Sequence, residues 1–306
     1  MQVNIAGVDF KNPVIAASGT FAFGEEYRLY MDVSELGGIT LKALTKEKRL
    51  GNPPVRIAET ASGVLNAVGL QNPGVDAFLE NQYPRVQSIN TVQIANIAGA
   101  SVEEYVYVAR RMNDTDISLY EVNVSCPNVK HGGVNFGTDA VVLKNVVREV
   151  KDVSKKPVIV KLTPNVTNIV AMAKAAKEGG ADALSLINTI TGMAIDPVTR
   201  RPVLANVTGG LSGPAIKPVA LRMVHEVYSA GLSLPIIGMG GIMTGRDAAE
   251  FMIAGADAVM VGTATMRNPS ATANIVRELT AFAREAGLSR IAELTGTLRL
   301  EGEKIC

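Results

Sequence analysis

The sequence predicts an α/β fold, a (β/α)8 TIM barrel with inserted strands and loops over its C-terminal rim, and three observations lead to this prediction. Eight short apolar runs rich in β-branched residues recur along the 306 residues. Amphipathic helical patterns separate most of these runs, which is typical of repeated βα units around a parallel sheet. Several runs end in Gly, Asn, Thr or Lys, so polar residues should gather at one rim.

The elements are expected in regular alternation along the chain. The opening segment VNIAGVDFKNPV has the pattern of a hairpin and would close the barrel floor. The eight strands are expected at residues 14–19, 38–44, 93–99, 119–125, 158–164, 183–189, 235–241 and 258–264. Helices with apolar residues three and four apart are expected at residues 102–112, 139–153, 167–179, 217–230, 244–254 and 270–286.

Two intervals, residues 45–92 and 190–216, are too long for a plain crossover. Loops of that length in a compact fold usually have a function. The second interval could form a strand pair that folds over the rim. No linker, low-complexity tract or charge block interrupts the pattern, so residues 1–306 are expected to form a single domain.

Composition narrows the class of protein. Thirty Lys and Arg against 29 Asp and Glu leave a net charge of +1, which gives no global field to attract nucleic acid or an anionic membrane. The two cysteines, Cys126 and Cys306, have neither a second thiol nor a His at metal-ligand spacing, so we expect no disulfide framework and no metal site. The N-terminus has no signal-peptide pattern and no run is long enough to span a bilayer, so a soluble, cytoplasmic protein is expected.

Cys126 is the first candidate for a catalytic residue. It lies in LYEVNVSCPN (119–128), where an apolar strand runs out into a loop, and in a barrel enzyme that edge carries the chemistry. An arbitrary cysteine more often fills a gap in the core. Here, however, Asn123 and Asn128 offer amide donors and acceptors on either side of it, and a polar, Gly-containing stretch follows.

A phosphate-binding pattern follows the last two strands. Gly240 and Gly241 come after the seventh strand, and Gly262 and Thr263 come after the eighth. Backbone N–H groups at such positions, near a helix N-terminus, can bind an anion without any lysine. One Gly–Gly pair could simply end a strand, but matching sites after neighbouring strands favour a phosphate ligand.

Two lysines, Lys42 and Lys161, lie at the ends of apolar strands, where a buried charge needs a partner. Beside a flavin mononucleotide, such a lysine would stabilise the negative charge that develops on reduction. Either lysine could instead form a Schiff base with a carbonyl substrate, or cap the rim through a salt bridge. The pattern alone leaves these three readings open.

A series of longer motifs resembles one known family. ASGTFAFGEEY, KALTKEKRLGNPPVRIAETASGVLNAVGLQNPG, NVSCPNVKHGG, VKLTPNVT, INTITG, NVTGGLSGPAIKP and IIGMGGI occur in order over nearly the whole length. In this series the chain closely resembles the catalytic subunits of the class 1B dihydroorotate dehydrogenases, flavin-dependent barrels of pyrimidine biosynthesis. The resemblance implies that dihydroorotate is oxidised to orotate. It gives Cys126 the role of the base that removes the C5 proton while hydride passes from C6 to FMN.

The resemblance also implies two sets of binding residues. The substrate pocket would comprise Lys42, Asn66, Ala67, Val68, Gly69, Leu70, Asn123, Asn128, Asn188 and Thr189. The FMN site would comprise Ser18, Lys42, Ala43, Asn96, Asn123, Lys161, Ile187, Gly213, Gly240, Gly241, Gly262 and Thr263. Of the remaining candidates, His131 would belong to a loop over the site, His225 would pack on a helix face, and Cys306 would be incidental.

The fate of the electrons is implied only by the family. The chain has no iron–sulfur ligand pattern and no GxGxxG after its first strand. Class 1B enzymes pass electrons to NAD⁺ through a partner subunit with FAD and a 2Fe–2S cluster, in a heterotetramer of two copies of each chain, whereas class 1A homodimers use fumarate. Three other functions stay open: a dihydropyrimidine dehydrogenase-type flavin domain, a barrel lyase or isomerase that binds a sugar phosphate, and a non-catalytic binding subunit.

Overall fold

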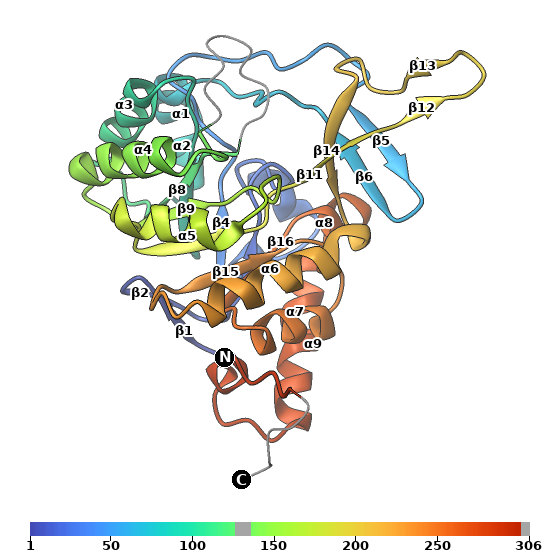
Figure 1. The fold of residues 1–306 in the computed structure, drawn as a ribbon. Helices are drawn as coiled ribbons and strands as arrows, with labels where there is room; N and C mark the ends of the chain where they lie inside the picture. Colours follow the sequence, from blue (N-terminus) through green and yellow to red (C-terminus); the bar gives the residue numbers. More distant parts are fainter. Residues whose placement is uncertain (126–135, 301–306) are drawn as a thin grey trace.

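The computed structural model describes residues 1–125 and 136–300, and at its centre eight parallel strands form a closed barrel (Figure 1). The strands follow one another around the barrel in chain order, and the last pairs with the first through Val259 and Val14. They are β3 (Val14–Ala16), β4 (Gly38–Thr40), β7 (Val92–Ile97), β8 (Leu119–Asn123), β9 (Val158–Lys161), β10 (Ala183–Leu186), β15 (Ile236–Met239) and β16 (Ala258–Val261). The predicted (β/α)8 barrel is confirmed.

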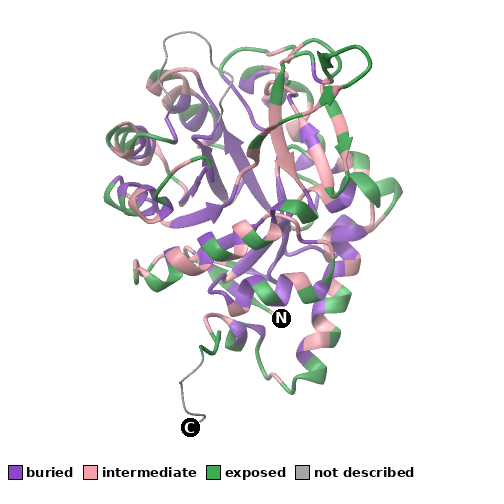
Figure 2. Cartoon of the chain, turned by 45° about the vertical axis from the view of Figure 1, so that its right-hand side comes forward, coloured by how far each residue is buried: buried purple, intermediate pink, exposed green. Residues whose placement is uncertain are grey.

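The barrel strands are buried on both faces, as parallel strands covered by helices must be (Figure 2). All four residues of β16, for example, are buried. Each strand lies where the apolar run predicted it but ends two to four residues early, because the ladder stops where the chain turns out at the rim. The polar residues at the ends of the predicted runs therefore belong to the rim loops.

All six predicted helices are present around the barrel. They are α3 (Val102–Met112), α4 (Ala140–Val153), α5 (Ile169–Glu178), α6 (Lys217–Ser229), α7 (Gly245–Ile253) and α9 (Ala271–Glu285). Four of them begin after a side chain that accepts a hydrogen bond from the first turn, namely Ser101, Asp139, Asn168 and Thr244. Such caps explain why these boundaries agree with the sequence pattern to within two residues.

Shorter helical segments were not predicted, because one or two turns show no periodicity. They are α1 (Val75–Asn81), α2 (Tyr83–Val86), α8 (Thr263–Arg267) and the 3-10 helices η1 (Glu25–Leu29), η2 (Val33–Glu35), η3 (Pro214–Ile216) and η4 (Ile291–Leu294). The prediction that the eighth strand reaches residue 264 was wrong, because the chain leaves the ladder after Val261 and α8 begins at Thr263.

A second, four-stranded antiparallel sheet lies over the rim, in the order β11-β14-β6-β5. The predicted strand pair of residues 190–216 is confirmed as β11 (Ile190–Met193) and β14 (Thr208–Ser212). The interval 45–92 adds two strands that were not predicted, β5 (Ile57–Thr60) and β6 (Gly63–Asn66). Figure 1 shows this sheet at one side of the barrel mouth, with the small hairpin of β12 (Ile195–Asp196) and β13 (Arg201–Pro202) projecting beyond it.

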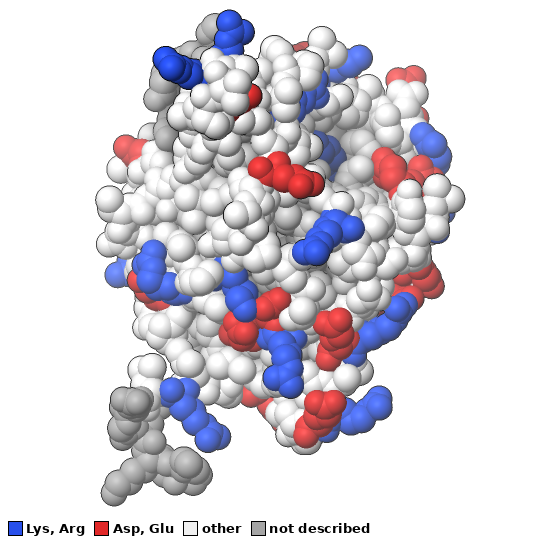
Figure 3. Space-filling view, turned by 90° about the vertical axis from the view of Figure 1, so that its right-hand side faces the viewer, with Lys and Arg blue, Asp and Glu red and all other residues white. Residues whose placement is uncertain are grey.

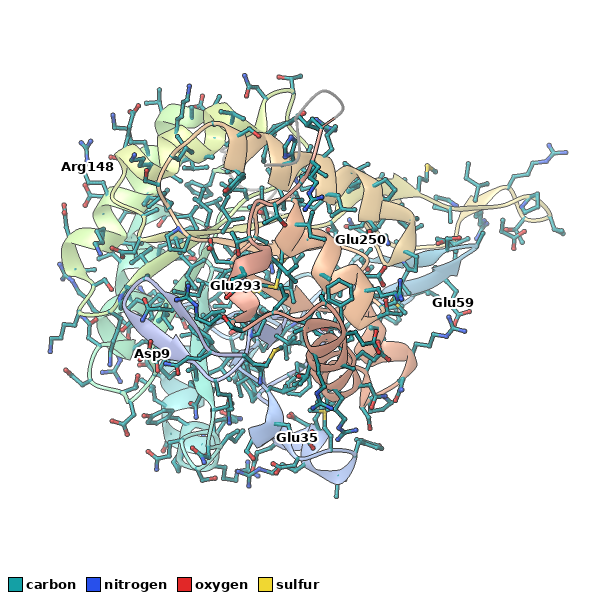
Figure 4. All side chains as sticks on the ribbon, turned by 90° about the horizontal axis from the view of Figure 1, so that it is seen from below. Asp9, Glu35, Glu59, Arg148, Glu250 and Glu293 are labelled. Atoms are coloured by element: carbon teal, nitrogen blue, oxygen red, sulfur yellow. The ribbon has the colours of Figure 1, made fainter. Side chains whose placement is uncertain are left out.

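The same arrangement is visible from below. Figure 4 labels Glu59 on the projecting sheet and Arg148 on α4 at the opposite flank of the molecule. The sheet has a small apolar core of its own, made of Leu65, Ala67 and Leu204. It is thus a cover for one side of the rim rather than an extension of the barrel.

The opening hairpin of β1 (Val3–Ile5) and β2 (Val8–Phe10) forms as predicted and lies at the barrel floor. Phe10 is fully buried, and its ring lies so close to Gly38, the first residue of β4, that a Cβ there would come within 2.9 Å of it. The floor is therefore closed by an aromatic side chain, and the open end of the barrel is the rim at the carboxyl ends of the strands.

The surface carries charges of both signs. On the face shown in Figure 3, Lys and Arg alternate with Asp and Glu without a large region of either sign. Within residues 1–125 and 136–300, no helix is long and apolar enough to cross a membrane.

Candidate active site

One cavity opens at the carboxyl ends of the barrel strands, beneath the second sheet. Its wall combines rim loops of the barrel with residues of β5, β6 and β14. The predicted site residues that line it are Ser18, Lys42, Ala43, Asn66, Ala67, Val68, Gly69, Leu70, Asn123, Lys161, Ile187, Asn188, Thr189, Gly213, Gly240, Gly241, Gly262 and Thr263. Segments far apart in the chain thus meet at one place, as the barrel topology requires.

Two other predicted residues, Asn96 and His225, do not line the cavity. Cys126, Asn128, His131 and Cys306 lie outside the described residues. Asn96 is fully buried on β7 and is not part of the cavity wall. His225 lies on α6, with its ring Nε2 3.5 Å from the Ser229 hydroxyl.

A layer of buried polar side chains lies inside the barrel, directly below the cavity. At its centre is the Glu121 carboxylate on β8, which is completely shielded from solvent. It accepts hydrogen bonds from the Asn96 amide at 2.5 Å and from the Ser185 hydroxyl at 2.7 Å. Its Oε2 also lies 3.7 Å from the Lys161 ammonium. The carboxylate therefore links strands β7, β8, β9 and β10.

Glu121 was not among the residues predicted from the sequence. A signal was present, because a single acid in the middle of LYEVNVS interrupts an otherwise apolar strand. Four residues that line the cavity were not predicted either: Ser125, Ser212, Met239 and Met260. Small and apolar residues of this kind have no distinctive pattern in a sequence, so only the fold can place them.

Two lysines face the cavity and influence one another. Lys161, on β9, is only 5% exposed, and Lys42 follows β4. Burial lowers the pKa of Lys42, and the positive charge of Lys161 lowers it further. The cavity lining therefore includes two cationic side chains, of which only Lys161 has an acidic partner in the described part of the chain.

An asparagine cluster lies beside these lysines. Asn123 is 9% exposed, and its Oδ1 accepts hydrogen bonds from the Ser125 backbone N–H at 3.2 Å and the Asn188 amide at 3.4 Å. The Asn66 amide donates to the Gly210 carbonyl at 3.3 Å, which ties it to the covering sheet. The long bonds leave much of the donor capacity of these amides available to a ligand.

Glycines of three loops form another part of the cavity lining. Gly213, Gly240 and Gly241 have φ angles of +96°, +130° and +75°, which favour glycine. A Cβ at Gly241 would lie 2.8 Å from the Gly213 carbonyl oxygen, so the two loops approach too closely for any side chain. Gly262 precedes α8, and the Thr263 hydroxyl donates to Ser212 at 2.8 Å. The backbone of three loops is therefore exposed to one region of the cavity.

Comparison with known proteins gives a consistent result. A family model described as dihydroorotate dehydrogenase matches residues 1–282. Proteins named dihydroorotate dehydrogenase B (NAD(+)), catalytic subunit, are 55% identical in Alkaliphilus metalliredigens, over 97% of this chain and 98% of that protein, and 52% identical in Petrotoga mobilis, over 97% and 99%. A protein of the same name from Geobacter is 54% identical over 98% of both chains.

A solved structure agrees on the fold. The crystal structure of DHODH in complex with ferulenol from Eimeria tenella superimposes with a TM-score of 0.82 at 24% sequence identity. The match covers 97% of this chain and 88% of that one. At that level of identity the similarity shows the fold alone.

Proposed function

The chain belongs to the dihydroorotate dehydrogenase family, and from this premise we propose that it oxidises (S)-dihydroorotate to orotate in pyrimidine biosynthesis, as the catalytic subunit of the NAD⁺-linked type. The observation that carries the proposal is a single cavity whose wall joins the lysine, asparagine and glycine sets of the family's site. It occurs in a chain that is 55% identical, over 97% of its length, to a protein of that name.

The asparagines suit the substrate. Dihydroorotate is a cyclic diamide with a carboxylate, and Asn66, Asn123 and Asn188 can donate to its oxygens and accept from its ring N–H groups. A site built from such groups rejects analogues that leave them unpaired. The remaining substrate contacts would come from Lys42, the backbone of residues 67–70, Asn128 and Thr189.

The cavity also fits FMN. The crowded glycine loops leave backbone groups open to a phosphate at Gly213, Gly240, Gly241, Gly262 and Thr263. In the layer below the cavity wall, the buried Oδ1 of Asn96 has no hydrogen-bond partner among the described residues, and a buried acceptor left open next to a site is commonly satisfied by a ligand or water. When bound, FMN supplies a flavin ring that accepts hydride from C6 of the substrate. The other FMN contacts would come from Ser18, Lys42, Ala43, Asn123, Lys161 and Ile187.

Lys161 and Cys126 would have different roles in the reaction. Lys161 would lie beside the pyrimidine edge of the flavin and stabilise negative charge there. Cys126 would take the proton from C5, so that the C5=C6 double bond of orotate forms as hydride leaves C6. Asn123 and Ser125 line the cavity just before Cys126 in the chain, which supports that role.

The electrons would leave through a partner. The relatives are named catalytic subunits of NAD(+)-type enzymes, so we infer a separate electron-transfer subunit here. By the family pattern that subunit holds FAD and a 2Fe–2S cluster, in a heterotetramer of two catalytic and two electron-transfer chains. Fumarate-linked oxidation and dihydrouracil oxidation are less well supported, because the relatives carry the NAD⁺-linked name.

Turnover of the full chain with an artificial acceptor tests the proposal. The purified chain, reconstituted with FMN, is supplied with L-dihydroorotate and an electron-accepting dye, and orotate is measured. We expect orotate to form in proportion to reduced dye, with no reaction on dihydrouracil and no advantage from fumarate. Orotate formed no faster than without protein would overturn the proposed function.

A further inference from the structure

Glu121 is a charged side chain that the proposed reaction does not use. It is fully buried inside the barrel, two residues before Asn123 on the same strand, so it lies one layer below the cavity wall. Donors from three neighbouring strands point at it: the amide of Asn96, the hydroxyl of Ser185 and the ammonium of Lys161. Polar hydrogens therefore approach the carboxylate from three sides.

Stability does not explain such a group. Removing a carboxylate and an ammonium from water is unfavourable, and apolar side chains of similar volume often replace a buried ion pair without loss of stability. A barrel interior is normally filled by apolar side chains. A buried ion pair at the layer next to the cavity is therefore better explained by what it does for the cavity.

The partner that matters is Lys161. Its ammonium is 3.7 Å from Glu121 Oε2, its side chain is 7% exposed, and it forms part of the cavity wall. The charged groups described around it are Glu121 on β8 and Lys42 after β4; Asn96 and Ser185 contribute neutral dipoles. Without Glu121, Lys161 would be a desolvated cation next to a second cation, and such a group loses its proton.

We propose that Glu121 is a positioning residue that keeps the Lys161 ammonium charged and fixed at the cavity wall. Asn96 and Ser185 hold the carboxylate in place, so the effect reaches from β7 to β10. The inference rests on the proposed function, because it gives Lys161 its use toward FMN. Its core, that the charge of Lys161 depends on Glu121, can be tested with or without the cofactor.

The first test uses the FMN-loaded chain and sulfite. Sulfite adds reversibly to oxidised flavin and bleaches it, and the anionic product is stabilised by a cation near the pyrimidine edge. Glu121→Gln keeps the shape of the side chain and removes its charge. If Lys161 loses its proton or its place, the Kd for sulfite rises by about tenfold, the equivalent of one pKa unit. If Glu121 acted only as a nearby negative charge, its removal would tighten sulfite binding; a tighter or unchanged Kd overturns the proposal.

Two further variants separate positioning from general damage. Ser185→Ala removes one hydrogen bond to the carboxylate without changing any charge, and we expect the sulfite Kd to change less than threefold. In the background of Lys161→Met, Glu121→Gln should have no further effect, because the proposal routes its influence through Lys161. A full, additive effect of Glu121→Gln in that background contradicts the proposal.

The second test needs no flavin, so it remains valid if the proposed function fails. Acetic anhydride reacts only with unprotonated amines, and mass spectrometry can follow the acetylation of Lys161 against pH in the FMN-free chain, with the exposed Lys155 as reference. Glu121→Gln should move the labelling midpoint of Lys161 down by one pH unit or more and leave that of Lys155 unchanged. An unmoved Lys161 midpoint overturns the proposal. If Glu121→Gln does not fold, Glu121→Asp, with its carboxylate one methylene further away, must shift the midpoint in the same direction.

Discussion

Cys126 is the residue on which the proposed chemistry depends most. A positioned base contributes roughly 10²- to 10⁴-fold to a rate, so Cys126→Ala should slow flavin reduction by dihydroorotate by that factor while FMN stays bound. Cysteine has a reference pKa of about 8.5 and acts as a base only as thiolate, so the rate of the unchanged chain should climb with pH until the thiol is ionised. Stopped-flow absorbance measures both. An unchanged rate, or a protein that has lost its flavin, would contradict the assignment.

Substitution of Gly241 tests whether the glycine loops bind the phosphate of FMN. A methyl group at Gly241 would meet the Gly213 carbonyl oxygen at 2.8 Å, and its φ of +75° disfavours alanine. Gly241→Ala should therefore weaken FMN binding by tenfold or more, as measured by flavin fluorescence on titration. Gly231→Ala is the matched control, because Gly231 also has a positive φ, +63°, but nothing lies within 4 Å of its Cβ position. Equal FMN affinity in both variants would show that the glycine loops do not hold the cofactor.

At this scale the sequence predicted residue types better than residue partners. Lys161 was recognised as a buried charge in need of a partner. Its partner could not be named, because Glu121 meets it only through the lateral pairing of β8 with β9, in which Asn123 lies opposite Lys161. The register between strands is set when the barrel closes, and it cannot be predicted from a single sequence.

At the scale of elements, the four-stranded sheet over the rim is expected to position residues that bind the substrate. Gly210 on β14 pairs with Asn66 on β6, and a Cβ at Gly210 would collide with the Thr189 side chain, 2.0 Å from its Oγ1. Gly210→Ala should displace Thr189 and raise KM for dihydroorotate by about tenfold, which corresponds to about 1.4 kcal/mol, without loss of FMN. Gly192→Ala on the adjacent strand is the control, since its Cβ would only approach the flexible end of Leu65 at 3.1 Å. Loss of FMN together with the rise in KM would count against a substrate-side role of the sheet.

Helix α7 depends on an ionised cap. Burial raises the pKa of Asp247, but hydrogen bonds from Lys217, the Met243 N–H and Thr244 outweigh it and leave the pKa below the usual range. A group with a depressed pKa stabilises the fold above its unfolded pKa of about 3.9, and that contribution is lost as pH falls through the folded value. Asp247 also completes the capping box of α7, and Lys217 forms a second salt bridge with Glu250, which Figure 4 labels on the same helix.

Asp247→Asn should accordingly lower the free energy of unfolding at pH 7 by about 0.5–2 kcal/mol, the usual cost of a lost cap. The variant should also lose less stability on acidification to pH 3 than the unchanged chain. Urea unfolding at several pH values measures both effects. Asp114→Asn is the control, because the Asp114 side chain is 84% exposed in its salt bridge and solvent screens such a pair, so its loss should change stability much less. The same acid dependence in both variants would rule out Asp247 as its source.

Elements were predictable where the chain has a long periodic pattern, as in the six helices around the barrel, and four of these helices also begin after a capping side chain. Strands β5 and β6 were not predicted, because apolar and polar residues hardly alternate in ETASGVLNAVG. Strand β6 is instead held by its pairing with β14, which lies far along the chain. The strand pair of residues 190–216 was predicted because its turn signals lie within one short segment.

At the scale of the whole molecule, the cavity is lined by residues from Ala17 to Met266, so ligand binding should stabilise the barrel as a unit. A ligand at one hundred times its Kd adds about 2.7 kcal/mol to the folded state. For a chain of this length, that predicts a rise in Tm of about 3–5 °C with excess FMN. Differential scanning calorimetry measures the shift, and riboflavin, which lacks the phosphate, is the control. An equal rise in Tm with riboflavin would show that the phosphate group does not contribute to binding.

The most direct measurement is an anaerobic absorption titration of the FMN-loaded chain with L-dihydroorotate and, separately, with dihydrouracil. We expect dihydroorotate to bleach the flavin bands, with one equivalent of orotate formed per flavin. Dihydrouracil should leave the spectrum unchanged, because the pocket is proposed to bind the substrate carboxylate. Bleaching by dihydrouracil alone, or a chain that shows no flavin bands after incubation with FMN, would contradict it.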